Sequence, residues 1–292
     1  MTTRHIGYYG LGGAGHDLAR RLAAAQPILA ADAGAPDPAN HADTGIDIVT
    51  PAALFARCEV IFLHLDGETS ADALLLGDTG LLRDAPDLTT LVLQSAADPA
   101  EVAALAAQLA QRQIALIDAP LLGLPGARPG PGATIVCGGD ADAVARITPL
   151  LGQMAARVIP CGGSGAGQAA RLVDIASFAA NWVVTQECVG AGLAHGLQPG
   201  DMARVFAKSS GRNSASERAF ALISDTGAAE VPLGAMRRDF DAVVAAATAT
   251  GAPMMLAHMA TAMLRSDINL FGDDAAIDRI HRIAGAIAQA GR

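Results

Sequence analysis

The sequence is poor in lysine and in aromatic residues, and it has no excess of positive charge. Lys208 is the single lysine among 20 basic residues. Aromatic residues make up 3% of the 292 positions, so alanine and aliphatic side chains must fill the core of a chain that is 51% hydrophobic. The net charge of −9 argues against nucleic acid or an anionic membrane as a partner, because both bind basic surfaces.

Cysteine is also scarce, and the four cysteines are widely separated in the sequence. No CxxC pair, HExxH pattern or histidine cluster is present, so the sequence predicts neither a disulfide framework nor a bound metal. The N-terminus lacks the apolar segment of a signal peptide. We therefore expect a soluble, cytoplasmic protein.

Residues 242–264 are the one stretch that resembles a membrane span, because they contain no acid, lysine or arginine. Gly251 and Pro253 interrupt this stretch, and it is rich in alanine and threonine rather than leucine. The pattern predicts two buried helices joined by a turn rather than a transmembrane helix.

Short apolar runs alternate with alanine-rich helical stretches over the first 160 residues. Strands are expected at 5–10, 27–33, 59–65, 90–95, 114–120 and 133–139. Thr50 and Asp98 each precede a proline and are predicted to be the N-caps of helices. This alternation is typical of a mostly parallel sheet covered by helices on both faces.

The strand signal ends near residue 165, where a helical pattern begins. Helices are expected at 166–194, 199–208, 215–225, 232–250, 253–265 and 273–290. The sequence therefore predicts an α/β domain over residues 1–163 and an all-α domain over residues 164–292.

A glycine-rich turn follows the first predicted strand and opens a predicted helix. Its residues form a GxGxxG pattern: Gly10, Leu11, Gly12, Gly13, Ala14 and Gly15. Asp32 ends the next predicted strand, which completes the context of a dinucleotide-binding fingerprint. Asp32 would accept hydrogen bonds from an adenosine ribose and repel a 2′-phosphate, and no arginine follows it in "ADAGAP". We expect these residues to bind NAD, with NADP as the alternative.

Several further segments resemble the β-hydroxyacid dehydrogenase family, which includes 3-hydroxyisobutyrate dehydrogenases and tartronate semialdehyde reductases. The similar segments occur in the family's order over nearly the whole chain: "GYYGLGGAG", "FLHLDG" (62–67), "LQSAA" (93–97), "DAPLLG" (118–123), "GSGAGQAARLVDI", "SSGRNS" (209–214) and "RRDF" (237–240).

The resemblance implies a Rossmann-type domain, a long interdomain helix and a helical domain that supplies homodimer contacts. It also implies hydride transfer between a nicotinamide and a small hydroxy acid. Leu65, Ser95 and Ala96 would lie against the cofactor, and Leu122 and Gly123 against the substrate.

The sequence departs from the family pattern at the positions that carry the chemistry. Arg171 stands where the family has a catalytic lysine, and Ile175 where it has an asparagine. Leu122 replaces a substrate-binding serine, and Arg238 replaces a lysine. A guanidinium does not exchange a proton near neutral pH, but it can bind a carboxylate through two parallel hydrogen bonds. We therefore expect Arg171 to bind an anionic substrate.

Proton transfer would then fall to another residue. Asp174 is a candidate, because helical spacing places it on the same face as Arg171 and Asn181. Lys208 is a second candidate donor, and Asn181 and Arg238 are expected to contact the substrate.

Three functions stay open on the sequence alone. The first is an oxidoreductase with an altered substrate and a relocated proton donor. The second is an imine reductase, because that related group also lacks the lysine and an iminium arrives already protonated. The third is a catalytically weak dinucleotide-binding scaffold.

Overall fold

The computed structural model describes residues 5–34, 44–65, 70–78, 80–123, 129–223 and 231–275. The chain forms two compact units. In the described part of the chain, the first unit lies between residues 5 and 171 and the second between residues 172 and 275. Because the division falls inside helix α6 (Ala166–Ala194), the first turns of that helix belong to the first unit.

A nine-stranded sheet forms the centre of the first unit. Its strands are β1 (His5–Tyr9), β2 (Ile28–Ala31), β3 (Ile46–Ile48), β4 (Cys58–Leu63), β5 (Thr90–Leu93), β6 (Ala115–Asp118), β7 (Leu121–Leu122), β8 (Thr134–Gly138) and β9 (Arg157–Gly162). The first six are parallel in the order β3-β2-β1-β4-β5-β6, which is the doubly wound order of dinucleotide-binding folds. β8 is antiparallel to β6 and β7, and β9 is parallel to β8.

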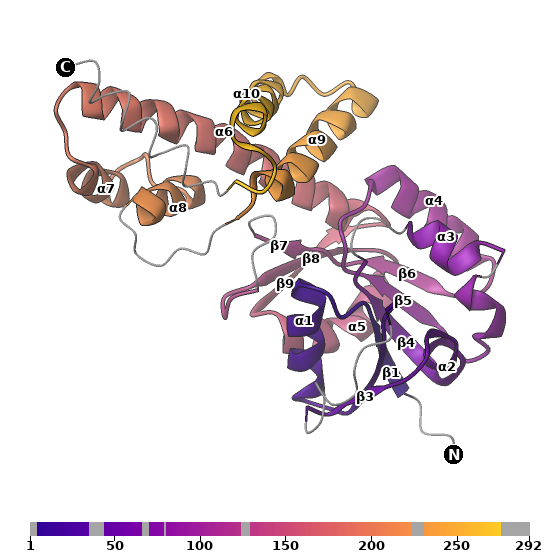
Figure 1. Cartoon of the computed structure of the whole chain (residues 1–292). Helices are drawn as coiled ribbons and strands as arrows, with labels where there is room; N and C mark the ends of the chain where they lie inside the picture. The colour runs from indigo at the N-terminus through magenta and orange to yellow at the C-terminus, as the bar shows by residue number, and fades with distance from the viewer. Residues whose placement is uncertain are drawn as a thin grey trace. The chain divides into compact units, whose positions relative to one another are not determined.

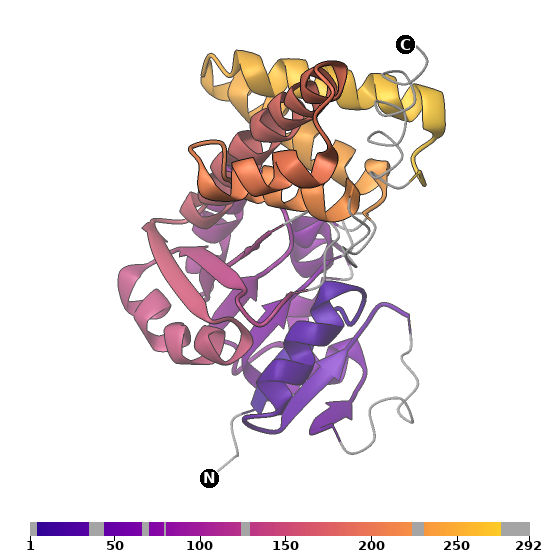
Figure 2. The ribbon, with the colours of Figure 1, turned by 90° about the vertical axis from the view of Figure 1, so that its left-hand side faces the viewer.

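Helices cover both faces of this sheet (Figure 1). One face carries α1 (Ala14–Ala23) and α5 (Ala141–Met154). The indigo helix α1 lies in front of the sheet in Figure 2. The other face carries α2 (Pro51–Arg57), α3 (Ala71–Leu76) and α4 (Pro99–Ala110). The predicted arrangement of a mostly parallel sheet with two covered faces is confirmed.

Successive strand residues point to opposite faces, and both faces are apolar. Phe62 and Val92 pack toward α1 and α5, while Ile61 and Leu91 pack toward α2 and α4, and all four are fully buried. Each such side chain stabilises the fold by about 1.5–3 kcal/mol through removal of apolar surface from water. This two-sided burial explains why the strands read as continuous apolar runs.

Both predicted helix caps are present. The Thr50 hydroxyl accepts a hydrogen bond from the Ala53 amide at 3.2 Å. The Asp98 carboxylate accepts bonds from the amides of Ala100 at 2.7 Å and Glu101 at 3.2 Å. These bonds satisfy amides that the first helical turn leaves without intrahelical partners.

Three strands are missing from the predicted list. β3 and β7 are only three and two residues long, so neither gives a readable apolar pattern. β9 lies at an edge, is mostly exposed and contains Pro160, so its sequence lacks the alternation of a half-buried strand. The prediction that 133–139 is the last strand was wrong.

The second unit is helical in its described residues. It contains the rest of α6, with α7 (Pro199–Lys208), α8 (Ser214–Ile223), α9 (Leu233–Thr250) and α10 (Met255–Phe271). Its core packs α6 against α9 and α10, and Phe178 and Trp182 stack there with ring centroids 5.8 Å apart. Five of the predicted helices are confirmed, and the sixth, at 273–290, lies almost entirely outside the described residues.

The apolar stretch at 242–264 forms the end of α9, a turn, and the first part of α10. Gly251 ends α9 in the left-handed conformation, with φ of 69°. In the described part of the chain, no helix has both the length and the apolar character that crossing a membrane requires. The expectation that both helices are buried was wrong for α10, because Met255 and Met259 are 74% and 60% exposed. A run without charges does not indicate which face of a helix is covered.

Candidate active site

The glycine-rich turn joins β1 to α1 at the carboxyl edge of the sheet. Gly10 has a φ of +94°, and its amide donates to the Ala31 oxygen at 2.9 Å. A Cβ atom on Gly10 would overlap the His64 carbonyl oxygen, and one on Gly15 would overlap the Gly10 carbonyl oxygen. Glycine at these two positions lets the start of α1 lie directly against the ends of β1 and β4.

The middle of the same turn is open. An added Cβ at Gly12 or Gly13 would meet no atom of the described residues within 4 Å, apart from those of its chain neighbours. Gly13, with φ of 51°, caps α1 without a side-chain hydrogen bond, and Leu11 and Ala14 flank the pair. Neither glycine therefore places a side chain over the start of α1, where the helix dipole favours an anion.

Asp32 lies beside this turn, at the end of β2. Its Oδ2 accepts a hydrogen bond from the Leu11 amide, and its Oδ1 accepts one from the Ala33 amide, both at 2.7 Å. Each carboxylate oxygen keeps a second lone pair with which it can accept a ribose hydroxyl. A cavity of about 500 Å³ adjoins Asp32 and is lined by Ile48, Thr50 and their neighbours. These residues fit the adenosine half of a dinucleotide.

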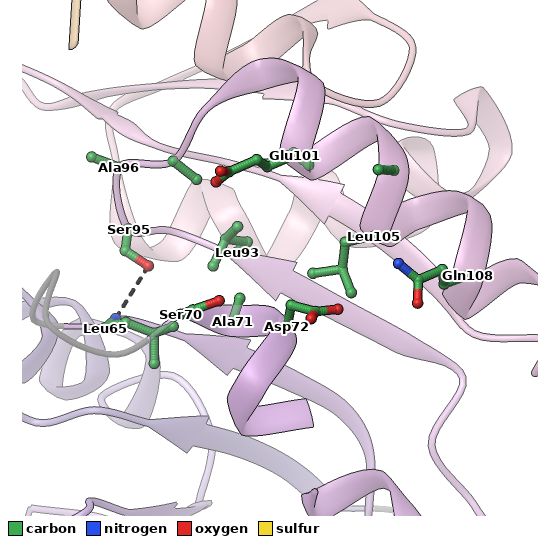
Figure 3. A pocket seen from close by; sticks show the side chains of 13 residues that line it. Leu65, Ser70, Ala71, Asp72, Leu93, Ser95, Ala96, Glu101, Leu105 and Gln108 are labelled. Carbon is green, nitrogen blue, oxygen red and sulfur yellow. Dashed lines mark hydrogen bonds between the residues drawn. The ribbon is translucent and has the colours of Figure 1, made fainter. Parts of the chain in front are cut away.

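Leu65 and Ser95 link the ends of the next two strands. The Leu65 amide donates to the Ser95 hydroxyl at 3.1 Å (Figure 3). Both residues, with Ala96, line a cavity of about 560 Å³ that extends between α3 and α4, where Asp72 and Glu101 are exposed. The predicted cofactor residues Leu65, Ser95 and Ala96 therefore lie together.

Asp118 holds the start of α6 against the sheet. Its side chain is fully buried, and its two oxygens accept bonds from the amides of Gly165 and Gln168, both at 2.8 Å. A Cβ on Gly167 would lie 2.7 Å from the Asp118 carbonyl oxygen, so this approach requires glycine. The carboxylate satisfies two free amides of the helix and complements its dipole.

Gln168 ties the same helical turn to the loop after β5. Its side chain is 1% exposed, and its amide donates to the Ser95 carbonyl oxygen at 2.8 Å and accepts from the Ala97 amide at 3.2 Å. Arg171 follows one turn later on α6 and is half-buried. The predicted catalytic residue Arg171 and the predicted cofactor residue Ser95 are therefore positioned by one helix within the first unit.

Reasoning from the sequence did not assign roles to Asp118 and Gln168. The available signal was an aspartate at the end of a predicted strand and glycines at the start of a predicted helix. Only the fold shows that these segments meet.

His64 follows β4 and lies under the glycine-rich turn. Its amide donates to the Tyr9 carbonyl oxygen at 2.8 Å, and its ring Cδ2 would lie 3.0 Å from a Cβ on Gly15. Burial lowers the pKa of the imidazole below its usual value, because the charged form loses hydration there. The ring is therefore neutral at pH 7.

The remaining predicted residues on α6 differ in surroundings. Asp174 is exposed, and Ile175 is buried in the core of the second unit. The Asn181 amide donates to the Ser177 carbonyl oxygen at 2.8 Å, so that donor is used within its own helix. Of the three predicted catalytic residues, Arg171 belongs to the first unit, and Asp174 and Lys208 belong to the second.

The other predicted substrate residues lie on separate elements. Leu122 is half-buried on the short strand β7, and Gly123 follows it with a φ of +142°. Lys208 is exposed at the end of α7, and Arg238 is exposed on α9. Their roles toward a substrate stay predictions.

Two family models match consecutive parts of the chain. The NAD binding domain of 6-phosphogluconate dehydrogenase matches residues 5–163. The model described as the NAD-binding part of NADP-dependent 3-hydroxyisobutyrate dehydrogenase matches residues 165–283.

Individual proteins are similar in sequence and in structure. Human mitochondrial 3-hydroxyisobutyrate dehydrogenase is 30% identical over 209 residues, which are 71% of this chain and 62% of that protein's length. A Mycobacterium tuberculosis 3-hydroxyisobutyrate dehydrogenase, solved with L-serine, shares the fold with a TM-score of 0.83 at 20% identity, over 96% of this chain and 99% of that one. An imine reductase from Myxococcus stipitatus is more distant, with a TM-score of 0.61 at 14% identity over 96% and 99% of the two chains. The chain belongs to the β-hydroxyacid dehydrogenase family.

Proposed function

We propose that this chain is an NAD-dependent oxidoreductase that transfers a hydride between the nicotinamide and a small anionic hydroxy acid or its carbonyl product. The observation that carries the proposal is the hydrogen bond from Gln168 to Ser95, because it fixes Arg171 near the sheet edge at which the dinucleotide binds. Family membership supports the reaction class.

The preference for NAD over NADP rests on Asp32 and its surroundings. The carboxylate has free lone pairs for the ribose hydroxyls, and its charge opposes a 2′-phosphate. No lysine or arginine occurs between positions 33 and 56 to neutralise such a phosphate. When bound, the nicotinamide supplies or accepts the hydride.

Arg171 is proposed to hold the substrate carboxylate. Guanidinium groups are unsuited to general acid or base catalysis, so we assign Arg171 to binding rather than to proton transfer. Its fork of donors matches a carboxylate with two parallel hydrogen bonds. 3-Hydroxyisobutyrate and L-serine, which the names of the similar proteins mention, are both carboxylates that carry a primary alcohol.

The proton of the reacting hydroxyl must leave as the hydride leaves its carbon. Asp174 is our first choice for accepting this proton, because it follows Arg171 by three residues on the same helix. Lys208 is the second choice. Leu122 and Gly123 of the first unit, and Asn181 and Arg238 of the second, are the further candidates for contacts with the substrate.

The proposal is tested by titrating the purified chain with NADH and NADPH, and then by measuring turnover of hydroxy acids, semialdehydes and cyclic imines. We expect tighter binding of NADH and turnover of a carboxylate substrate. Tight binding without turnover of any class would support a scaffold instead.

An imine reductase is the alternative enzyme, and its fold is shared at low identity. The cationic Arg171 opposes it, because a protonated imine is also a cation. Imine turnover that survives Arg171→Ala but is lost in Asp174→Ala would favour this alternative.

We also propose a homodimer formed through the helical unit. One face of α10 exposes large apolar side chains, including Met255, Leu256, Met259 and Leu270, which are 60–74% exposed. Exposed apolar patches of this kind commonly mark protein interfaces. Light scattering of the wild type should give the mass of two chains, and the Leu256→Glu/Met259→Lys variant should give the mass of one.

A further inference from the structure

The two nitrogens of the His64 ring lie in different environments. Among the residues that the structure describes, Nδ1 has no hydrogen-bond partner and is shielded from solvent, whereas Nε2 does not combine burial with a missing partner. Nε2 is bonded to Cδ2, the ring atom that faces Gly15. Nε2 is therefore at the edge of the ring next to the first turn of α1.

This difference decides which nitrogen carries the proton of the neutral ring. A proton on Nδ1 would be an enclosed donor without an acceptor, and proteins tolerate enclosed N–H groups less well than enclosed lone pairs. The doubly protonated ring would meet the same penalty and would also lose hydration. The favoured form is therefore neutral, with its single hydrogen on Nε2.

The surroundings of Nε2 match an anion. Gly12 and Gly13 place no side chain over the start of α1, where the helix dipole favours a phosphate. The His64 main chain is fixed as well, because its amide is bonded to Tyr9 and its carbonyl lies against Gly10. These contacts hold the Cα atom of His64 beside the turn.

We propose that His64 is a cofactor-binding residue, whose Nε2–H donates a hydrogen bond to the pyrophosphate of the dinucleotide beside the amides of α1. The inference rests on the proposed dinucleotide binding and adds a side-chain contact to the backbone contacts of the glycine-rich turn. A neutral donor at this point binds the phosphate without adding a buried positive charge to the empty site.

The test compares three ligands in wild-type protein and in His64→Leu, His64→Met and His64→Gln variants. NADH and ADP-ribose contain the pyrophosphate, and adenosine lacks it. We expect His64→Leu and His64→Met to weaken NADH and ADP-ribose about tenfold, which is the loss of one hydrogen bond to a charged group. Adenosine binding should change less than about twofold, and His64→Gln, which keeps an N–H donor, should stay within about threefold of wild type.

The possible outcomes separate this inference from the proposed function. Unchanged NADH affinity in both apolar variants would overturn the role of His64, and so would an equal loss for adenosine, because that indicates damage to the fold. If wild-type protein binds neither NADH nor NADPH, the proposed function itself fails. Circular dichroism shows whether each variant folds. If one of His64→Leu and His64→Met does not fold, the other is used for the comparison.

Discussion

The side-chain amide of Gln168 donates a hydrogen bond to the main-chain oxygen of Ser95, with 2.8 Å between nitrogen and oxygen. The two residues are 73 positions apart and both are buried. Because Ser95 also accepts a bond from Leu65, this contact connects α6 to the loops after β4 and β5. It is the link between the predicted cofactor residues and Arg171.

Removal of the Gln168 amide should therefore affect both stability and activity. Gln168→Leu leaves the Ser95 oxygen and the Ala97 amide without partners, and we expect the free energy of unfolding to fall by about 1–3 kcal/mol. kcat/KM should fall as well, because α6 loses its side-chain bonds to the loop after β5 near Arg171. Urea unfolding and steady-state kinetics measure the two effects. Gln198→Leu is the matched control, because Gln198 is exposed and makes no side-chain cap bond; an equal loss there would contradict the account.

Replacement by alanine should affect the stability of the protein differently at Gly10 and at Gly12 of the glycine-rich turn. At Gly10, the positive φ and the overlap with the His64 carbonyl should cost several kcal/mol, on the order of the strain and overpacking found at such sites. At Gly12, where a Cβ meets nothing, stability should change by less than about 0.5 kcal/mol. NADH affinity should nevertheless fall in Gly12→Ala, because the added methyl group enters the approach to the amides. Thermal unfolding measures the stability of both variants, and NADH titration measures their affinity. A Gly10→Ala variant as stable as wild type would contradict the conformation described for this turn.

The cofactor preference should be reversible at two positions. Asp32→Ser removes the charge that opposes a 2′-phosphate, and Ala33→Arg supplies a cation at the next, exposed position. We expect the double variant to bind NADPH at least about tenfold tighter than wild type does, as one charge-assisted hydrogen bond would provide. NADH should bind more weakly, because the ribose hydroxyls lose an acceptor. Equal ratios of the two dissociation constants in wild type and variant would rule out Asp32 as the discriminating residue.

The stability of the cofactor-free protein should depend on His64 at mildly acidic pH. Burial lowers the pKa of this imidazole in the folded chain, whereas the unfolded chain binds the proton near pH 6.5. Unfolding therefore takes up a proton below that pH, and stability is lost as the pH falls. Between pH 7.5 and 5.5, wild-type protein should lose more stability in urea than His64→Leu does. His195→Leu, at an exposed helix end, should behave like wild type.

Local patterns in the sequence predicted the features that depend on interactions between residues close together in the chain. Thr50 and Asp98 each cap a helix by accepting a bond from an amide at most three residues later. The positions of α6 and α7 follow from the helical pattern of the sequence. The strand β9 was missed because its side chains are mostly exposed and it contains Pro160, so its sequence lacks the alternation of a half-buried strand.

Local patterns could not predict the contacts that organise the candidate site, because these contacts join residues far apart in the sequence. Asp118 and Gln168 are 50 residues apart, and their bond depends on β6 ending where α6 begins. Neither residue type alone indicates that pairing. The enclosed nitrogen of His64 likewise depends on how closely Gly10 and Gly15 approach β4, which is a property of the packed sheet.

The binding of a substrate carboxylate by Arg171 is tested most directly by the KM of the hydroxy acid that wild-type protein oxidises fastest, compared with the KM of its primary amide. In Arg171→Ala, we expect KM for the acid to rise at least about tenfold, because a bidentate charged contact is lost. KM for the uncharged amide should change less than about threefold. An unchanged KM for the acid in Arg171→Ala would contradict the proposed role of Arg171.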